Sequence, residues 1–135
     1  FIEQLELAKQ YNLPVVLHLV GHISEAYKLL KQYNLSYLVH GYAGSIQGFK
    51  ELLRLKSFFT ISERLLKWDK KELLRAMIDS KSYLFETDIT RDYVQEEETN
   101  PLLRLNTLIS SVAEFAEIPR SKLIEQQQKN FNSYE

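Results

Sequence analysis

The stretch Leu13-Pro14-Val15-Val16-Leu17-His18 indicates how the rest of this 135-residue chain is organised. Proline disfavours helical geometry in the residue before it, so the helical pattern of residues 1–11 ends here. The short run of β-branched and aliphatic residues that follows is typical of a strand buried on both faces. A histidine closes the run, where a polar side chain would leave the strand.

The same strand pattern returns three more times, at residues 37–39, 58–61 and 83–85. Helical patterns lie between and after these runs. We expect helix starts at Ser24, at Ser45, at an Asp69/Glu72 capping box and at Asn100-Pro101, with a last short helix over residues 122–128. Strands separated by single helices predict a parallel sheet with right-handed crossovers. The fold class is therefore α/β, either a small open sheet or part of a (β/α)8 barrel.

Composition bounds the functional classes. The formal net charge is -1, which gives no global attraction to nucleic acid or to an anionic membrane. There is no cysteine, so disulfides and thiolate metal sites are excluded. No apolar run approaches the roughly 18 residues that span a bilayer, and no signal peptide is recognisable. We expect one domain over residues 1–135, no membrane partner and a cytoplasmic location.

Polar side chains follow three of the four expected strands. His18 and His40 end the first two, and Glu86-Thr87-Asp88 ends the fourth. The carboxyl ends of parallel strands lie at the same edge of a sheet, so these groups should converge. Imidazole with carboxylate suits zinc or manganese, and more carboxylate favours magnesium. Taken singly, a histidine here is usually a satisfied polar residue and an aspartate a turn residue. Glu86 shares the parity of Asp88, and we interpret it as structural.

Four segments in this order resemble successive motifs of the TatD hydrolases: residues 1–8, 13–18, 39–45 (VHGYAGS) and 84–88 (LFETD). These hydrolases belong to the amidohydrolase superfamily of (β/α)8 barrels. The resemblance covers the whole chain and implies four to five βα units of a TIM-type barrel, the C-terminal half of such an enzyme. It also implies a divalent metal ion (Mg, Mn or Zn) and hydrolysis of phosphodiester bonds, with DNA as the substrate of several members.

The resemblance assigns roles residue by residue. His18 matches the metal ligand after the fifth barrel strand, and His40 matches the ligand after the sixth. Asp88 matches the acid after the eighth strand, a metal ligand that also handles the proton of the attacking water. The family's first-strand His-x-His pair and its bridging glutamate have no counterpart in this chain. His22 is a conceivable substitute donor, which we interpret as a solvated loop histidine.

Two other functions remain open from the sequence. A catalytically incomplete half-barrel could associate with itself or with another half through its open sheet edges. Alternatively, the helix start at Gly41, Gly44 and Ser45 could bind a phosphorylated ligand without hydrolysis. The basic run Arg64, Lys67, Trp68, Lys70 and Lys71 reads as a solvated helix start, although it could neutralise phosphates. We expect the isolated chain to be inactive or nearly so.

Overall fold

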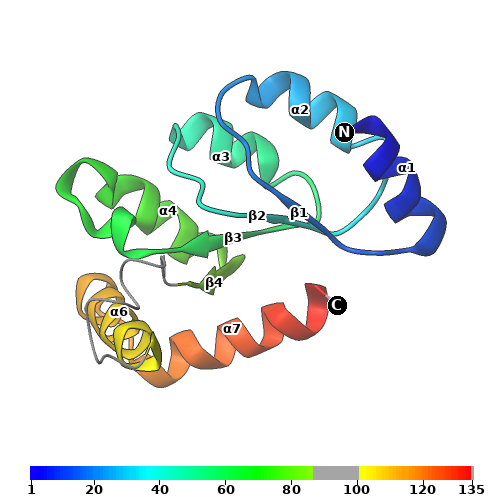
Figure 1. Cartoon of the computed structure of the whole chain (residues 1–135). Coiled ribbons are helices and arrows are strands. Elements are labelled where there is room, and N and C mark those ends of the chain that lie inside the picture. The colour runs from blue at the N-terminus through cyan, green and yellow to red at the C-terminus, as the bar shows by residue number, and fades with distance from the viewer. Residues whose placement is uncertain (87–100, 135) are drawn as a thin grey trace.

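The four strands pair in the order in which they occur along the chain (Figure 1). The computed structural model describes residues 1–86 and 101–134. Strands β1 (Val15–Leu17), β2 (Tyr37–Val39), β3 (Ser57–Ile61) and β4 (Tyr83–Phe85) form one parallel sheet. A doubly wound sheet reverses its strand order at a switch point, whereas a barrel does not. The observed order is therefore that of a partial barrel, as the resemblance implied.

One helix precedes the first strand, and the others connect the strands or follow the last of them. They are α1 (Ile2–Tyr11), α2 (Ile23–Leu30), α3 (Ile46–Leu52), α4 (Lys71–Ser80), α6 (Pro101–Ala116) and α7 (Arg120–Tyr134), with the 3₁₀ turns η1 (Glu63–Leu66) and η2 (Trp68–Lys70) after β3. In Figure 1, α2 and α3 lie on one side of the sheet and α7 runs along β4 on the other. The strands run from right to left in this view, so their carboxyl ends share the left-hand side.

Two of the predicted helix starts are wrong. Ser24 does not cap α2, which begins at Ile23 behind His22; the Ser24 hydroxyl instead donates to Glu51 of α3 at 3.0 Å. The Asp69/Glu72 capping box also fails, because residues 68–70 form a 3₁₀ turn and α4 begins at Lys71 without a side-chain cap. The Ser45 cap is confirmed, since its Oγ accepts from the Gly48 N–H at 3.0 Å.

One face of the sheet is covered by the connecting helices. The other, here called the unfinished face, is partly exposed. Tyr37, Val39 and Phe59 point toward the helices that connect the strands and are almost fully buried. The Phe59 ring meets Phe49 of α3 edge-on, with centroids 4.6 Å apart. Alternate residues point to the other face, where Val16 is 63% exposed. In a complete barrel this second face lines the interior.

In the segment after β2, the Tyr42 side chain packs against the backbone of the residues that follow it. Tyr42 is buried, and its hydroxyl donates to the Ser45 carbonyl at 2.6 Å. A Cβ added at Gly48 would lie 2.6 Å from the Tyr42 hydroxyl, and one added at Gly44 would lie 3.0 Å from it. Gly41 has a left-handed φ of 67°, which lets the chain turn directly after the second strand. These glycines therefore have structural roles in this turn.

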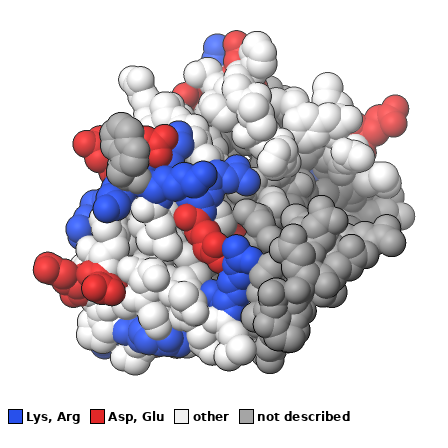
Figure 2. Space-filling view, turned by 60° about the vertical axis from the view of Figure 1, so that its left-hand side comes forward, with Lys and Arg blue, Asp and Glu red and all other residues white. Residues whose placement is uncertain are grey.

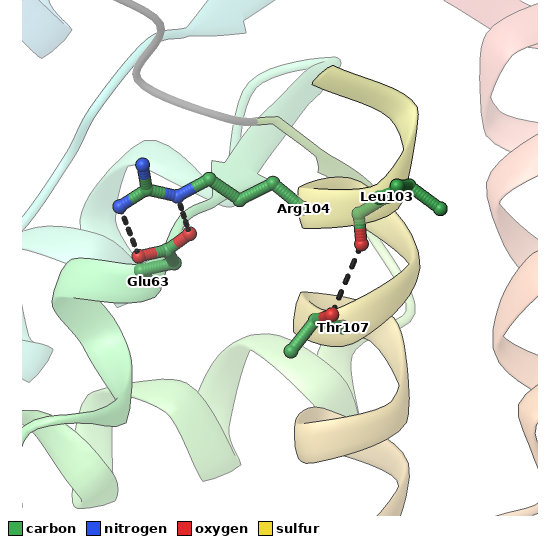
Figure 3. Close-up of polar contacts among 4 residues, drawn as sticks. All are labelled: Glu63, Leu103, Arg104 and Thr107. Carbon is green, nitrogen blue, oxygen red and sulfur yellow. Dashed lines mark hydrogen bonds and ion pairs between the residues drawn. The ribbon is translucent and has the colours of Figure 1, made fainter. Parts of the chain in front are cut away.

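An ion pair ties α6 to the carboxyl end of β3 (Figure 3). The Arg104 guanidinium faces the Glu63 carboxylate of η1 with two nitrogens, one of them 3.0 Å from Oε2. The hydrogen bond from Arg104 holds the pKa of Glu63 below its usual range. A carboxyl whose pKa is depressed by folding stabilises the fold above its unfolded pKa. That contribution is lost as pH falls through the folded-state pKa.

The last helix, Arg120–Tyr134, is longer than the predicted 122–128. Its amide side chains form hydrogen bonds with the free edge of β4. Ser82 and Glu86 form the backbone hydrogen bonds to β3, so Tyr83 and Phe85 direct theirs outward. Gln127 Oε1 accepts from the Phe85 N–H at 2.7 Å. Asn130 Nδ2 donates to the carbonyls of Tyr83 and Lys81, each at 2.8 Å. Side chains of α7 thus bond where a further strand would pair.

Replacing Asn130 by alanine should destabilise the fold by about 1–3 kcal/mol, because it leaves the buried Tyr83 carbonyl of β4 without its side-chain donor. Asn130 is 6% exposed. The matched control is Asn132→Ala on the same helix, where the exposed amide only accepts from Gln128. We expect the control to change stability by roughly 0.5 kcal/mol or less. Urea unfolding measures both, and equal effects of the two substitutions would contradict the edge-capping role.

Candidate metal centre

His18 and His40 lie side by side at the carboxyl ends of neighbouring strands. The His40 N–H donates to the Leu17 carbonyl at 2.7 Å, which extends the pairing of β1 and β2 as far as the two histidines. Their ring centroids are 6.2 Å apart and the rings are tilted by 45°. Two imidazoles on one tetrahedral ion, at about 2.1 Å each, have centroids roughly 5 Å apart. The observed separation of 6.2 Å exceeds that value, so the two rings are neighbours but are not at ligand spacing.

The third predicted ligand, Asp88, lies outside the described residues. Within residues 1–86 and 101–134, no group of three or more His, Asp and Glu side chains is arranged to hold a metal ion. The structure therefore brings the two predicted imidazoles together and leaves the carboxylate of Asp88 untested.

Glu86, which the sequence led us to interpret as structural, contacts His40 directly. Its Oε2 lies 2.6 Å from His40 Nε2. Its Oε1 accepts from the hydroxyl of Thr60 on β3 at 2.8 Å, and that hydroxyl accepts from the Gly41 N–H at 2.9 Å. The parity of Glu86 on its strand was visible in the sequence. Its pairing with a residue two strands away was not, because that depends on register.

His22 lies at the start of α2 and faces solvent. Its side chain is 90% exposed, at the N-cap of α2 with a left-handed φ of 51°. Nδ1 lies 4.0 Å from a carboxylate oxygen of Glu25, three residues further along the chain. Both features suit the solvated loop histidine that we expected.

A hollow of about 350 Å³ opens beside His18. Its lining includes Gly21, Tyr42, Ser45 and Arg64. Ser45 is already engaged as the cap of α3 and as the acceptor for Tyr42. Burial is the main cause that raises the pKa of the Tyr42 phenol, so this hydroxyl acts here as a neutral donor. Binding of a phosphorylated ligand in this loop stays a prediction.

Basic side chains gather on the side of the molecule toward which the strands point. Figure 2 shows Lys and Arg in a band across this side, with Asp and Glu interspersed. The turns after β3 and the start of α4 carry four basic residues, Arg64, Lys67, Lys70 and Lys71. Lys70 Nζ donates to the Ala43 carbonyl at 2.8 Å, so this lysine also ties the turn after β3 to the one after β2. Arg64 also lines the hollow beside His18.

No helix in the described part of the chain combines the length and the apolar character that crossing a membrane requires. A search among curated proteins finds no match.

Solved structures share this fold at low sequence identity. The TatD homologue YJJV of Escherichia coli K12 is 24% identical, with a TM-score of 0.77 over 98% of this chain and 54% of its own. An uncharacterized amidohydrolase from Saccharomyces cerevisiae gives a TM-score of 0.79 at 14% identity, over 98% of this chain and 57% of its own. A TatD family hydrolase from Entamoeba histolytica gives 0.76 at 12% identity, over 96% and 53%. The chain thus spans about half the length of each relative.

The sequence also matches a protein family described as TatD related DNase, over residues 1–134. This match extends across the strand-end histidines and both terminal helices. The chain belongs to the TatD family.

Proposed function

We propose that residues 1–135 form a single domain, the C-terminal half of a TatD-type metal-dependent hydrolase that in its complete form cleaves phosphodiester bonds of DNA. The observation that carries the proposal is the adjacency of His18 and His40, with ring centroids 6.2 Å apart, in a member of this family. Neighbouring parallel strands deliver both imidazoles to one edge of the sheet.

The donor set suits a divalent cation, Mg, Mn or Zn. His18 and His40 would hold it through ring nitrogens, and Asp88 would add a carboxylate after β4. Imidazole favours zinc and manganese, while carboxylate also accommodates magnesium. A bound cation supplies a more acidic water and positive charge beside the phosphoryl oxygens.

Residues of this chain would carry out the proton transfer and the neutralisation of phosphate charge. Asp88 would take the proton of the attacking water, as its match to the family's acid suggests. Arg64 and Lys67 follow β3, and Arg64 lines the hollow beside His18. They would neutralise backbone phosphates of a DNA strand. Because the net charge is only -1, such attraction would be local to this side.

The isolated chain should bind metal weakly and hydrolyse little. It has no counterpart of the first-strand His-x-His pair or of the bridging glutamate that the family resemblance implies. Electrostatic stabilisation of a transition state depends on a complete, preorganised set of groups. Three of the expected ligands cannot provide it alone.

Substoichiometric Mn²⁺ should broaden the imidazole NMR signals of His18 and His40 and spare those of His22. The His18 and His40 rings lie side by side, with centroids 6.2 Å apart, whereas the His22 side chain is 90% exposed and lies beside Glu25. His18→Ala should remove the effect at His40, and His40→Ala the effect at His18, while His22→Ala should leave it intact. Broadening of equal strength at all three histidines would contradict a shared site.

In a complete protein that joins this chain to a first half carrying the His-x-His pair and the glutamate, Asp88→Asn should lower metal-dependent DNA cleavage at least a hundredfold. The amide keeps the shape of the side chain but cannot accept the proton of the attacking water. The matched control is Asp69→Asn in η2, at an exposed position. Cleavage of a labelled duplex with Mg²⁺ or Mn²⁺ measures both. Full activity in the Asp88 variant would remove it from the mechanism.

The unfinished face of the sheet favours a second candidate, association of this half-barrel with another copy or another half. A hollow of about 500 Å³ there is lined partly by apolar side chains, such as Leu38, Leu84 and the exposed Phe131, and partly by polar ones that include His40 and Glu86. Strand β1 forms the open edge, because α7 amides occupy the hydrogen-bonding positions of β4. A partner would therefore approach β1 and cover Val16.

Sedimentation velocity tests this candidate directly. The chain should sediment as a dimer at micromolar concentration, and Val16→Lys should shift it to monomer by placing a charge on the face that becomes buried. The control is Val20→Lys, at a position that is exposed but lies beyond the strand. A wild-type monomer at all concentrations would rule out self-association.

A further inference from the structure

A hollow of about 320 Å³ lies between the carboxyl-terminal end of α4, the start of β4 and helix α7. Its lining includes Tyr83, the first residue of β4, so the hollow lies at the amino end of that strand. The candidate metal centre lies at the carboxyl ends of the strands. The hollow is therefore separate from that centre, and the proposed function gives it no role.

Tyr83 is the one buried tyrosine in the described part of the chain whose hydroxyl has no hydrogen-bond partner there. The other three, Tyr33, Tyr37 and Tyr42, each donate to a carboxylate or a backbone carbonyl, at 2.6 to 3.0 Å. Tyr83 is only 3% exposed. No fully buried side-chain oxygen or nitrogen among the described residues lacks a partner, so the Tyr83 hydroxyl must reach accessible space. The hollow that Tyr83 lines provides that space.

A buried tyrosine normally finds a partner for its hydroxyl, so the free hydroxyl of Tyr83 is available to a ligand. Burial raises the pKa of the Tyr83 phenol. The group therefore stays neutral and can donate a hydrogen bond to an anion.

Three lysines surround the same hollow: Lys81 at the end of α4, and Lys122 and Lys129 on α7. Lys122 and Lys129 are seven positions apart, about two helical turns, so they lie on one face of α7. Glu125 also lines the hollow, but in the described part of the chain it forms no ion pair with these lysines. Three lysines against one glutamate leave the lining with an excess of positive charge.

A phenol donor beside this excess of positive charge favours a phosphate monoester as the ligand. Such a group carries close to two negative charges at neutral pH and has three strong acceptor oxygens. Ile78 and Ile118 add an apolar wall, which suits a small organic group esterified to the phosphate. The volume of the hollow is at the lower end of the range for ligand pockets, roughly 300–1,000 Å³.

We propose that this hollow binds the phosphate group of a small phosphate monoester, with the Tyr83 hydroxyl and the three lysine ammonium groups as its donors. The walls are fixed relative to each other, because Asn130 of α7 donates to the Lys81 carbonyl at 2.8 Å. The site needs no divalent cation, and it does not depend on the proposed hydrolysis.

Titration of the metal-free 135-residue chain with inorganic phosphate and with thymidine 5′-monophosphate tests the proposal. At constant ionic strength, both should produce saturable shifts in the amide NMR signals of residues 81–83 and 122–129, and acetate should produce none. Equal affinity for the two compounds would identify free phosphate as the ligand, whereas tighter binding of the nucleotide would identify the ester. Absence of saturable shifts with both at millimolar concentration would overturn the proposal.

Tyr83→Phe is the most direct variant, because its hydroxyl has no partner within the described residues. It should leave the free energy of unfolding nearly unchanged and lower phosphate affinity about two- to tenfold. The matched control, Tyr37→Phe, removes a hydroxyl that donates to the Leu30 carbonyl at 2.7 Å. It should lower stability in urea unfolding without changing phosphate affinity. Unchanged affinity in the Tyr83 variant would remove this hydroxyl from the site.

Lys81→Gly removes one ammonium group at a position that glycine tolerates, because Lys81 has a left-handed φ of 61°. Its phosphate affinity should fall about two- to fivefold, the range for an exposed ionic contact. Lys122→Gln and Lys129→Gln should have similar effects. The control is Lys28→Gln, at an exposed position of α2. An equal loss in the control would show a general charge effect and contradict a defined site.

Discussion

The candidate site depends on the parallel register of four short strands. Val15, Val16 and Leu17 pair with Tyr37, Leu38 and Val39, and the same register continues into β3 and β4. A strand that slipped by one residue would turn every side chain to the opposite face. His40 would then point toward the connecting helices, and its contact with Glu86 would be lost. The register is maintained by the helix-facing residues, among which Val39, Phe59 and Ile61 have no exposed surface.

The two faces of the sheet accordingly differ in composition and in role: one stabilises the fold and the other carries the candidate site. The helix-facing side is apolar and closely packed, and supplies the burial that stabilises the sheet. The other side carries the histidines, Glu86 and Thr60 toward the carboxyl ends of the strands, and apolar residues such as Val16 and Leu38 behind them. A complete barrel would enclose this side. Here it is covered in part by α7, where the Tyr134 ring stands edge-on to Phe58 at 6.2 Å.

The α7 helix gives the two edges of the sheet different properties. Gln127 and Asn130 provide hydrogen-bond partners to β4 that a neighbouring strand would otherwise supply. An edge capped in this way resists the addition of another strand, which is a common risk for open sheets. The edge at β1 has the exposed Val16 instead.

The sequence alone determined the positions of the four strands and the parallel α/β class, because each apolar run is short, β-branched or aromatic, and followed by a helical pattern. It also predicted that His18 and His40 would lie close together, because the carboxyl ends of parallel strands meet at one edge of the sheet. Only the tertiary structure decided the monotonic strand order, the failure of the Ser24 and Asp69 caps, and the contacts of Asn130 and Glu86. The contacts of Ser24, Glu86 and Asn130 involve partners far away in the chain, such as Glu51 for Ser24 and Thr60 for Glu86. Local periodicity carries no information on which distant residues the packing of the strands will bring into contact.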